Sequence, residues 1–341
     1  MSTTQTTLET TFIGLKLKNP VIAGASDLTA NLDRIRKLED NGAAAIVTKS
    51  LFEEQLQFEQ MRMEDQENEV SNRHPMMTSV FPQGIEIGPE EHLMWVEKAK
   101  KAVDIPVVAS LNAVSPEAWM DYAKALAETG VDALELNLYA SPRGIDLSGS
   151  DIETEQISIV GQVSDMVDIP VCAKLSPFYS NPLNVIAAMD RRGADGFVLF
   201  NKLFQPEMNV DSEKHIFPLN LSTEGDCRLP LRYAGLLSGT LSAGICSSGG
   251  IFSGKDVAKM LLAGANCVQM VSALYRNGIE HLQSVLRELG EWMEKHSYNA
   301  IGDFKGKLNR ENTPDPWAYT RAQYVKQLLR GNPLEKTWDN E

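Results

Sequence analysis

The chain has 341 residues, which is long for one average domain but ordinary for a single α/β barrel with insertions. Its formal net charge of −14 argues against a nucleic-acid-binding protein, which would normally carry a basic face. No apolar run approaches the roughly 20 residues that span a bilayer, and the N-terminus lacks the features of a signal peptide, so we expect a cytoplasmic, globular protein without membrane contact.

Short apolar runs alternate with polar, helix-compatible stretches along the chain, which favours a parallel sheet. The predicted strands are eight such runs, at residues 20–25, 43–49, 106–111, 132–138, 169–175, 195–201, 243–248 and 266–271. Four joins between a helix and the next strand carry a glycine, at Gly42, Gly130, Gly193 and Gly264, where a left-handed conformation ends a helix. The repetition indicates the α/β class and a single (β/α)8 TIM barrel.

Three stretches are longer than a minimal barrel needs: residues 51–92, 139–152 and 202–240. Each follows a predicted strand, so we expect long loops at the C-terminal face, where barrel enzymes carry their active sites. Residues 1–310 are expected to form one barrel domain. Residues 311–341 are expected to form a tail that packs on the barrel or on a neighbouring subunit.

The four cysteines, Cys172, Cys227, Cys246 and Cys267, are scattered and contain no C-x-x-C spacing. Three lie in or beside predicted strands, where cysteine acts as a small core residue. We therefore expect no metal site, no iron–sulfur site and no disulfide.

Five polar side chains stand at or just after the ends of predicted strands. Lys49 and Lys174 end the second and fifth runs, and Asn112, Asn137 and Asn201 follow the third, fourth and sixth. A lysine at a barrel mouth can stabilise an anion, form a Schiff base or support a flavin, and amides can bond ring carbonyls and nitrogens. Each alone could be a solvated lysine or a turn asparagine, but together they favour a ligand site.

A phosphate site is expected near the last two strands of such a barrel. Gly249-Gly250 follows the seventh run, and Val271-Ser272 follows the eighth. Paired glycines let backbone N–H groups approach a phosphate, although Gly-Gly alone also suits a plain turn. No G-x-G-x-x-G follows the first strand, so a nicotinamide-binding domain is not indicated.

The chain resembles the dihydroorotate dehydrogenase family and is most similar to its soluble class 1 members. The similarity covers roughly the first 310 residues. It is carried by Asn19-Pro20-Val21, Ala23-Gly24-Ala25-Ser26, Val47-Thr48-Lys49-Ser50, Glu135-Leu136-Asn137-Leu138, Ala173-Lys174-Leu175-Ser176-Pro177, Ser248-Gly249-Gly250-Ile251, the segment from Leu262 to Gln269, and the segment from Asp303 to Leu308.

The resemblance implies FMN at the barrel mouth, a homodimer, and oxidation of dihydroorotate to orotate by hydride transfer to flavin N5 in pyrimidine biosynthesis. It places substrate contacts at Lys49, Asn137 and Asn201, and it makes Lys49 a catalytic candidate as well. The implied cofactor-binding positions are Ala25, Ser26, Lys49, Ser50, Asn112, Asn137, Lys174, Asn201, Gly249, Gly250, Val271 and Ser272.

The catalytic base is the first departure from the family pattern. Class 1 members read Asn-Leu-Ser-Cys-Pro-Asn after the fourth strand, with the cysteine as base, and class 2 uses serine. Here the stretch is one residue longer before Pro142. Alignment on Pro142 puts Ser141 at the base position, whereas alignment on Asn137 puts Ala140 there and leaves no base. Ser141 is our catalytic candidate, ahead of Tyr139, although an unassisted serine is a poor base.

The second departure from the family pattern concerns the segments that bind orotate in the family. The family's substrate-binding asparagine has no match in residues 79–85, and residues 222–228 replace a glycine-rich segment. Arg143 and Lys202 stand where the family has asparagine and serine or threonine. Both could be solvated loop residues, or they could select a different anionic substrate.

Several readings stay open. The substrate is dihydroorotate or a related dihydropyrimidine or enone-like compound, and the electron acceptor is soluble, such as fumarate. A second class is a barrel that binds FMN or another phosphate ligand without redox turnover. A third is an aldolase that uses Lys174 as a Schiff base. A partner subunit carrying an iron–sulfur cluster cannot be read from one chain.

Overall fold

The computed structural model describes residues 6–52, 89–113, 115–139, 145–203, 205–315 and 317–329. In these ranges the eight predicted strands are present and parallel. They pair in the order β4-β3-β13-β12-β9-β8-β7-β6, and a further pairing of β4 with β6 closes the barrel. This confirms the predicted (β/α)8 fold. The barrel strands are β3 (Val21–Ala23), β4 (Ala45–Val47), β6 (Val107–Asn112), β7 (Ala133–Asn137), β8 (Val171–Leu175), β9 (Gly196–Leu199), β12 (Gly244–Ser248) and β13 (Cys267–Met270).

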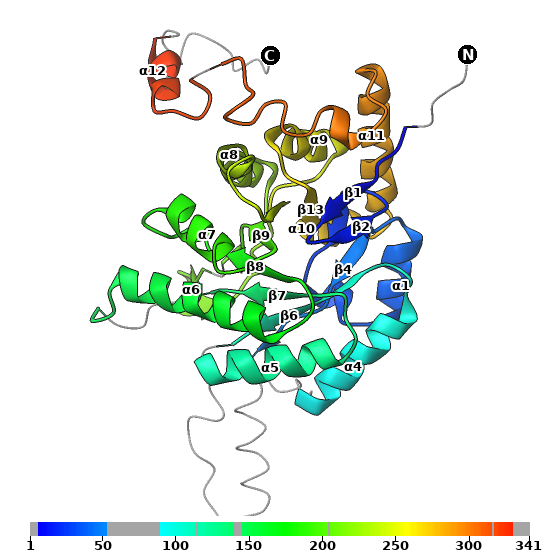
Figure 1. Ribbon diagram of the computed structural model, residues 1–341, viewed down its shortest axis with the longest axis vertical. Coiled ribbons are helices and arrows are strands. Elements are labelled where there is room, and N and C mark those ends of the chain that lie inside the picture. The colour runs from blue at the N-terminus through cyan, green and yellow to red at the C-terminus, as the bar shows by residue number, and fades with distance from the viewer. Residues whose placement is uncertain are drawn as a thin grey trace, which may run out of the picture.

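Helices surround the barrel (Figure 1). Their apolar faces pack on the outward-facing strand residues, such as Leu134 and Leu136, in one large core. Helix starts carry the expected signals: Ser115 and Ser253 accept hydrogen bonds from backbone N–H groups of the first turn. The surrounding helices are α1 (Leu32–Asp40), α4 (Pro89–Ala102), α5 (Pro116–Glu128), α6 (Gly149–Met166), α7 (Pro182–Asp190), α8 (Arg228–Leu237), α9 (Gly254–Ala263) and α11 (His281–Lys295).

The four repeated glycines behave as the sequence predicts. Their φ angles are 102° at Gly42, 82° at Gly130, 100° at Gly193 and 110° at Gly264. These values lie in the region that other residues rarely adopt, so each glycine ends its helix and turns the chain into the next strand.

An N-terminal hairpin closes the bottom of the barrel. It consists of β1 (Thr10–Phe12) and β2 (Leu15–Leu17), which pair antiparallel. Phe12 and Ile13 press on the first residues of β9 and β12: a Cβ on Gly196 would lie 2.5 Å from Ile13 Cγ2, and one on Gly244 would lie 2.9 Å from Phe12 Cδ2. Above them, Cys172, Cys246 and Cys267 are fully buried in the barrel, as expected of small core residues.

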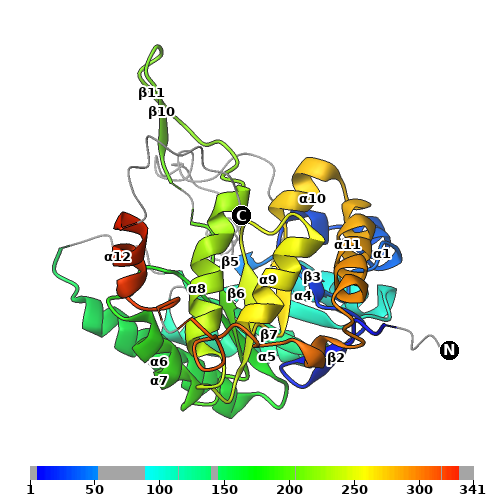
Figure 2. The ribbon, with the colours of Figure 1, turned by 90° about the horizontal axis from the view of Figure 1, so that it is seen from above.

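The region 202–240 is more regular than its sequence suggested. It contains a hairpin of β10 (Glu207–Asn209) and β11 (Lys214–Ile216), the 3-10 turn η2 (Glu224–Cys227) and the barrel helix α8. The hairpin projects from the end of the barrel opposite to β2 (Figure 2). Pro230 lies in the first turn of α8, where a proline is tolerated.

The C-terminal stretch runs back along the outside of the barrel. After η3 (Ile301–Asp303), the hydroxyl of Tyr319 donates to the carbonyl of Leu308, 2.6 Å away. The same ring covers Gly235 of α8, where a Cβ would lie 2.2 Å from the Tyr319 oxygen. Beyond it lies α12 (Ala322–Leu328). The remaining short elements are β5 (Leu51–Phe52), η1 (Asp27–Thr29) and α10 (Ser272–Asn277).

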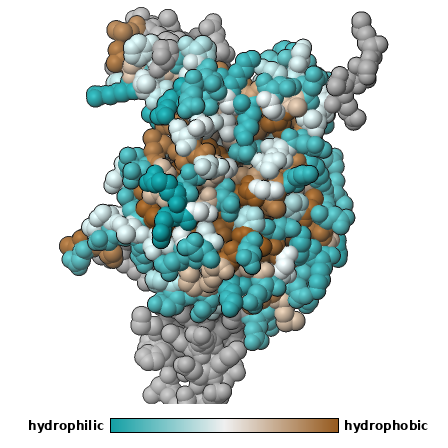
Figure 3. Space-filling view, viewed as in Figure 1, coloured by the Kyte–Doolittle hydropathy of each residue, from teal (hydrophilic) through white to brown (hydrophobic). Residues whose placement is uncertain are grey.

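The surface is mixed. Hydrophilic residues cover most of the face seen in Figure 3, and hydrophobic ones show between them in smaller patches. Among the helices in the described ranges, none is long and apolar enough to cross a membrane.

Candidate active site

A cavity of about 370 Å³ opens at the carboxyl ends of the strands. Parallel strands bring these ends to one face, so residues far apart in the sequence meet there. Most of the predicted site residues line the cavity: Ala25, Ser26, Lys49, Ser50, Asn137, Lys174, Asn201, Lys202, Gly249, Gly250, Val271 and Ser272.

Three predicted residues are not placed in this cavity. Asn112 ends β6, where it pairs with Phe52 of β5, and it is not among the lining residues. Ser141 and Arg143 lie outside the described residues. Tyr139, the second candidate for proton transfer, is exposed just beyond the end of β7. The identity of the base therefore stays a prediction.

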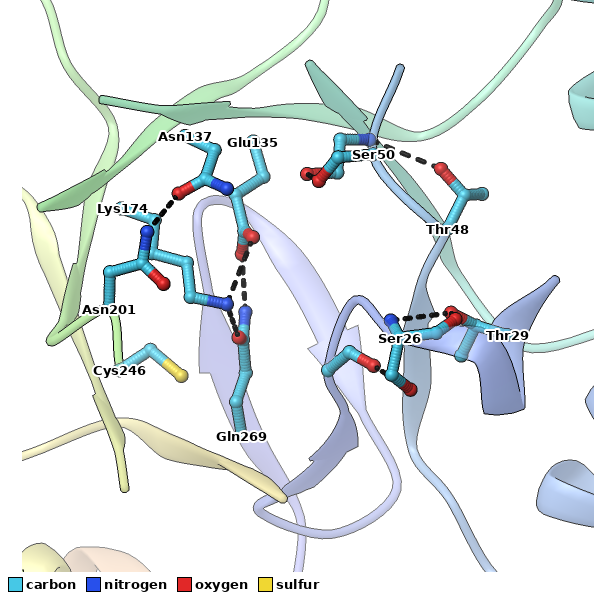
Figure 4. A network of polar contacts seen from close by, with 12 residues as sticks. Ser26, Thr29, Thr48, Ser50, Glu135, Asn137, Lys174, Asn201, Cys246 and Gln269 are labelled. Carbon is cyan, nitrogen blue, oxygen red and sulfur yellow. Dashed lines mark hydrogen bonds and ion pairs between the residues drawn. The ribbon is translucent and has the colours of Figure 1, made fainter. Parts of the chain in front are cut away.

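The floor of the cavity is a buried polar network (Figure 4). The Lys174 ammonium donates to Gln269 Oε1 at 3.1 Å and lies 3.5 Å from Glu135 Oε1. The Gln269 amide nitrogen donates to Glu135 Oε2. Glu135 is fully buried and only 9% of the Lys174 side chain is exposed, so the ammonium has little freedom and meets a ligand in one orientation.

Two amides form one wall above this floor. Asn137 ends β7 and Asn201 follows β9, and the Asn201 amide nitrogen donates to Asn137 Oδ1 at 2.7 Å. The backbone N–H of Asn201 donates to the carbonyl of Leu175, which fixes the chain there. Beside this bond, Asn137 Nδ2 can still donate and Asn201 Oδ1 can still accept, so the pair can bond a bound ring.

The two lysines at the rim each have a carboxylate partner. Lys49 lies 2.7 Å from Asp27, and Lys202 lies 2.8 Å from Asp226. Burial alone would raise the pKa of Asp226, but hydrogen bonds from Lys202 and Thr223 lower it below its usual value. Both ion pairs are partly exposed, so an anionic ligand can attract either lysine away from its carboxylate at a small cost in free energy.

Backbone approaches closely at the end of the cavity near β12 and β13. Gly249 and Gly250 have φ angles of 99° and 69°. A Cβ on Gly250 would lie 2.3 Å from the backbone nitrogen of Cys227, whereas one on Gly249 would meet only Ser222 Oγ, at 3.9 Å. The Ser272 hydroxyl accepts from the Ser222 N–H at 2.8 Å. This end offers backbone N–H groups and hydroxyls and is suited to a phosphate.

No cluster of three or more histidine, cysteine, aspartate or glutamate side chains that could hold a metal ion occurs in the part of the chain that the structure describes. The cavity offers ammonium groups, amides and hydroxyls, which bind carbonyls and phosphates.

Several polar lining or supporting residues were not predicted from sequence, among them Asp27, Glu135, Asp226 and Gln269. A signal existed for Glu135, because a carboxylate two positions before Asn137 in an apolar strand lies on the same inward face. Gln269 carries the same signal in β13. The aspartates lie in turns, where carboxylates are common, and nothing in their sequence context marks them.

A buried histidine lies near the rim and gives a testable pH dependence. Burial, and then the charge of Lys49, lower the pKa of His92 on α4 from 6.5 to about 4. The unfolded chain binds this proton below pH 6.5 and the folded protein only below about 4, so the free energy of unfolding falls as pH drops through that window. The full shift corresponds to about 3 kcal/mol.

We expect the wild-type protein to lose about 3 kcal/mol more stability than His92→Gln between pH 6.5 and 4 in urea unfolding. The exposed His215 on β11 supplies the matched control, because His215→Gln should keep the wild-type loss. Parallel pH profiles for the wild type and His92→Gln would contradict this account.

Comparison with known proteins identifies the family. Residues 7–293 match the sequence model of a family described as dihydroorotate dehydrogenase. The "Dihydroorotate dehydrogenase B (NAD(+)), catalytic subunit" of Thermoplasma volcanium is 29% identical over 319 residues, which cover 88% of this chain and 97% of the relative. Its namesake in Thermoplasma acidophilum is 27% identical over 309 residues, 88% of this chain and 98% of the relative. The "Putative dihydroorotate dehydrogenase A (fumarate)" of Pediococcus pentosaceus is 25% identical over 318 residues, with 88% and 99% coverage.

Proposed function

The chain belongs to the dihydroorotate dehydrogenase family, and from that premise we propose that it is an FMN-dependent oxidoreductase acting on dihydroorotate or a related dihydropyrimidine. The observation that carries the proposal is the arrangement of the cavity at the barrel mouth. A buried ammonium and two amides lie on one side, and the pair Gly249-Gly250, with close backbone approach at Gly250, lies at the end near β12 and β13. A single ligand with a polar ring and a phosphate would match both the ammonium–amide side and the glycine end of the cavity.

The residues present fit FMN. The cavity volume of about 370 Å³ lies within the range of cofactor sites. Lys174, Asn137 and Asn201 would contact the polar edge of the ring, with Ser26, Lys49 and Ser50 also on the cavity wall. The backbone N–H groups at Gly249, Gly250, Val271 and Ser272 would hold the phosphate, because these four residues line the end of the cavity near β12 and β13.

FMN would supply an acceptor for a hydride, and the side chains would do the rest. Asn137 and Asn201 would hold the substrate ring, and Lys49 at the rim would attract a substrate carboxylate. A base takes the proton from the carbon next to the one that loses hydride, which leaves a C=C bond. Ser141 is our candidate for that base, with Tyr139 second. Lys174 would face the negative charge that develops on reduction.

The proposed substrate contacts lie on a different part of the cavity wall. Lys202 is paired with Asp226 and lines the cavity, and Arg143 follows in the sequence where the family has an asparagine. These cations suit an anionic substrate. Dihydroorotate is the first compound to test because the relatives are named for it, and other anionic compounds with an oxidisable C–C bond are the alternative.

We also propose a soluble electron acceptor. The relatives' names specify two such acceptors, NAD(+) and fumarate. Because the NAD(+)-type relatives are named as catalytic subunits, a separate partner chain is a further candidate. Assays of the isolated protein with each acceptor would distinguish the two, since the NAD(+) reaction would then need the partner.

The cofactor proposal is tested by releasing and identifying the bound group. We expect the purified protein to be yellow and to release one FMN per chain on heating. The aldolase alternative predicts a colourless protein instead. Borohydride would inactivate that protein in the presence of a carbonyl substrate, by fixing the substrate covalently to Lys174. A protein that neither binds FMN nor forms a Schiff base at Lys174 would contradict both the flavin proposal and the aldolase alternative.

We propose in addition that the chain forms a homodimer through the β10–β11 arm. The arm projects from the barrel (Figure 2). Phe217 at its base is 84% exposed, and Met208 and Leu219 are also exposed. Large apolar groups exposed together mark interaction surfaces. A partner copy that packs there would bury them.

Replacing Phe217 by aspartate is expected to convert the protein to a monomer. Sedimentation should fall from about 75 kDa, twice the chain mass of 37.7 kDa, to the mass of one chain. Met94→Asp, at an exposed apolar residue on α4, should remain dimeric. Wild-type protein that sediments as a monomer would contradict the dimer, and a dimer that survives Phe217→Asp would place it elsewhere.

A further inference from the structure

Glu135 is a carboxylate with no access to solvent in the middle of the barrel. It lies at the centre of β7, between Ser110 of β6 and Cys172 of β8 in the sheet register. Burying a carboxylate costs free energy that packing alone does not recover, and an apolar residue of the same volume would serve the core equally well. Its contacts therefore indicate what it does.

The contacts of Glu135 reach across the barrel. β13, which carries Gln269, is four strands away from β7 in either direction around the barrel, so the two strands face each other. Gln269 donates its amide hydrogen to Glu135, and its amide oxygen accepts from Lys174. Since Lys174 also lies 3.5 Å from Glu135, one carboxylate, one ammonium and one amide form a closed ring (Figure 4).

Only two members of this ring face the cavity. Lys174 and Gln269 line it, whereas Glu135 lies beneath them and is not among the lining residues. Cys172 lies beside Glu135 in the sheet register, and burial, with a contribution from the charge of Glu135, raises the pKa of the Cys172 and Cys246 thiols. These thiols stay neutral, so Lys174 balances the charge of Glu135, and Gln269 adds a hydrogen bond.

We propose that Glu135 is a positioning residue that orients the Lys174 ammonium and the Gln269 amide, and that its charge sets how easily a flavin in the cavity is reduced. The inference rests on the proposed function, because it requires bound FMN. Reduced flavin carries negative charge that a nearby cation stabilises. A carboxylate behind that cation brings the net charge of the floor from +1 to zero and makes reduction harder.

The test is a charge series in the FMN-loaded protein. Glu135→Gln removes one negative charge from the floor, Gln269→Glu adds one, and the double exchange restores one carboxylate and one amide. At a fixed potential we expect the ratio of reduced to oxidised flavin to rise about tenfold in the first variant, which corresponds to about 30 mV for a two-electron couple. It should fall by a smaller factor in the second, because the two carboxylates then in contact share a proton and only part of the added charge remains.

The double exchange should return this ratio to within about threefold of the wild type. Anaerobic spectral titration against a redox dye measures all four proteins without substrate turnover. Cys172→Ala is the matched control, because it changes the packing beside Glu135 but not the charge, and its ratio should stay near that of the wild type.

Ratios that do not follow the charge of the floor, or a shift in Cys172→Ala as large as in Glu135→Gln, would overturn the inference. If Glu135→Gln fails to fold, Gln269→Glu and the double exchange decide it: the first must lower the ratio and the second must restore it. Wild-type protein without bound flavin would instead refute the proposed function, so the two failures are distinguishable.

Discussion

Replacing Lys174 by methionine is expected to lower the free energy of unfolding by about 3–5 kcal/mol, because it leaves Glu135 buried without its cation. The Glu135 carboxylate would keep one hydrogen bond, from Gln269, and gain no access to water. Removing one partner of a buried pair costs far more than the pair contributes, since the remaining charge is still desolvated.

Two variants make this prediction specific. Lys49→Met removes a lysine whose ion pair with Asp27 is largely exposed, so it should cost at most about 1 kcal/mol. Adding Glu135→Leu to Lys174→Met should recover most of the lost stability, because no unpaired charge remains. Urea unfolding of the flavin-free proteins measures all of them. Equal losses for Lys174→Met and Lys49→Met would show that the floor network is not buried as the structure has it.

Replacing Gly250 by alanine is expected to remove bound FMN and to destabilise the protein. The new Cβ would lie 2.3 Å from the backbone nitrogen of Cys227 and 2.8 Å from the carbonyl oxygen of Thr223. Backbone atoms cannot give way as a side-chain end can, so the turn at residues 223–227 must shift. We expect a cost of about 1–3 kcal/mol for this overlap, and more for the unfavourable φ angle.

Gly249 provides the control. It has a similar positive φ, but a Cβ there would meet only Ser222 Oγ at 3.9 Å. Gly249→Ala should therefore bear the conformational cost without the overlap and keep more of its flavin than Gly250→Ala. The flavin-to-protein absorbance ratio of the two purified variants measures the difference. Equal flavin content in both would contradict the assignment of the Gly250 turn to the phosphate end of the site.

Much of the architecture could be predicted because it depends on local patterns. The apolar runs are too short for helices and are separated by helix-length stretches, and the glycines at positions 42, 130, 193 and 264 mark the repeat. The β1–β2 hairpin was not predicted, since its three-residue strands are shorter than any periodicity can detect. Its role depends on Gly196 and Gly244, which are distant in sequence.

Placement of the strand-end residues also followed from the fold. In a parallel barrel the carboxyl ends of all strands lie at one face, so Lys49, Asn137 and Lys174 must meet there. The structure places all three in the same cavity. Asn112 did not follow this rule, because β6 continues beside β5 and carries Asn112 into that pairing. Whether any of these residues binds FMN or substrate stays a proposal.

The partners of these residues could not be predicted. Glu135 and Gln269 are 134 residues apart, and their contact depends on which two strands face each other across the closed barrel. The pairs of Lys49 with Asp27 and of Lys202 with Asp226 depend on loop conformations that carry no periodic signal. The sequence therefore predicted which groups reach the mouth but not how each is oriented or neutralised.

Anaerobic addition of L-dihydroorotate to the purified protein tests whether the chain oxidises this substrate. Bound FMN is expected to lose its visible absorbance as hydride is transferred, and air should restore it. Dithionite supplies the control, because it must bleach the flavin whatever the substrate. Flavin that dithionite bleaches but dihydroorotate leaves unchanged would contradict dihydroorotate as substrate and favour a different anionic compound or a non-catalytic FMN protein. Protein without flavin would contradict the account as a whole.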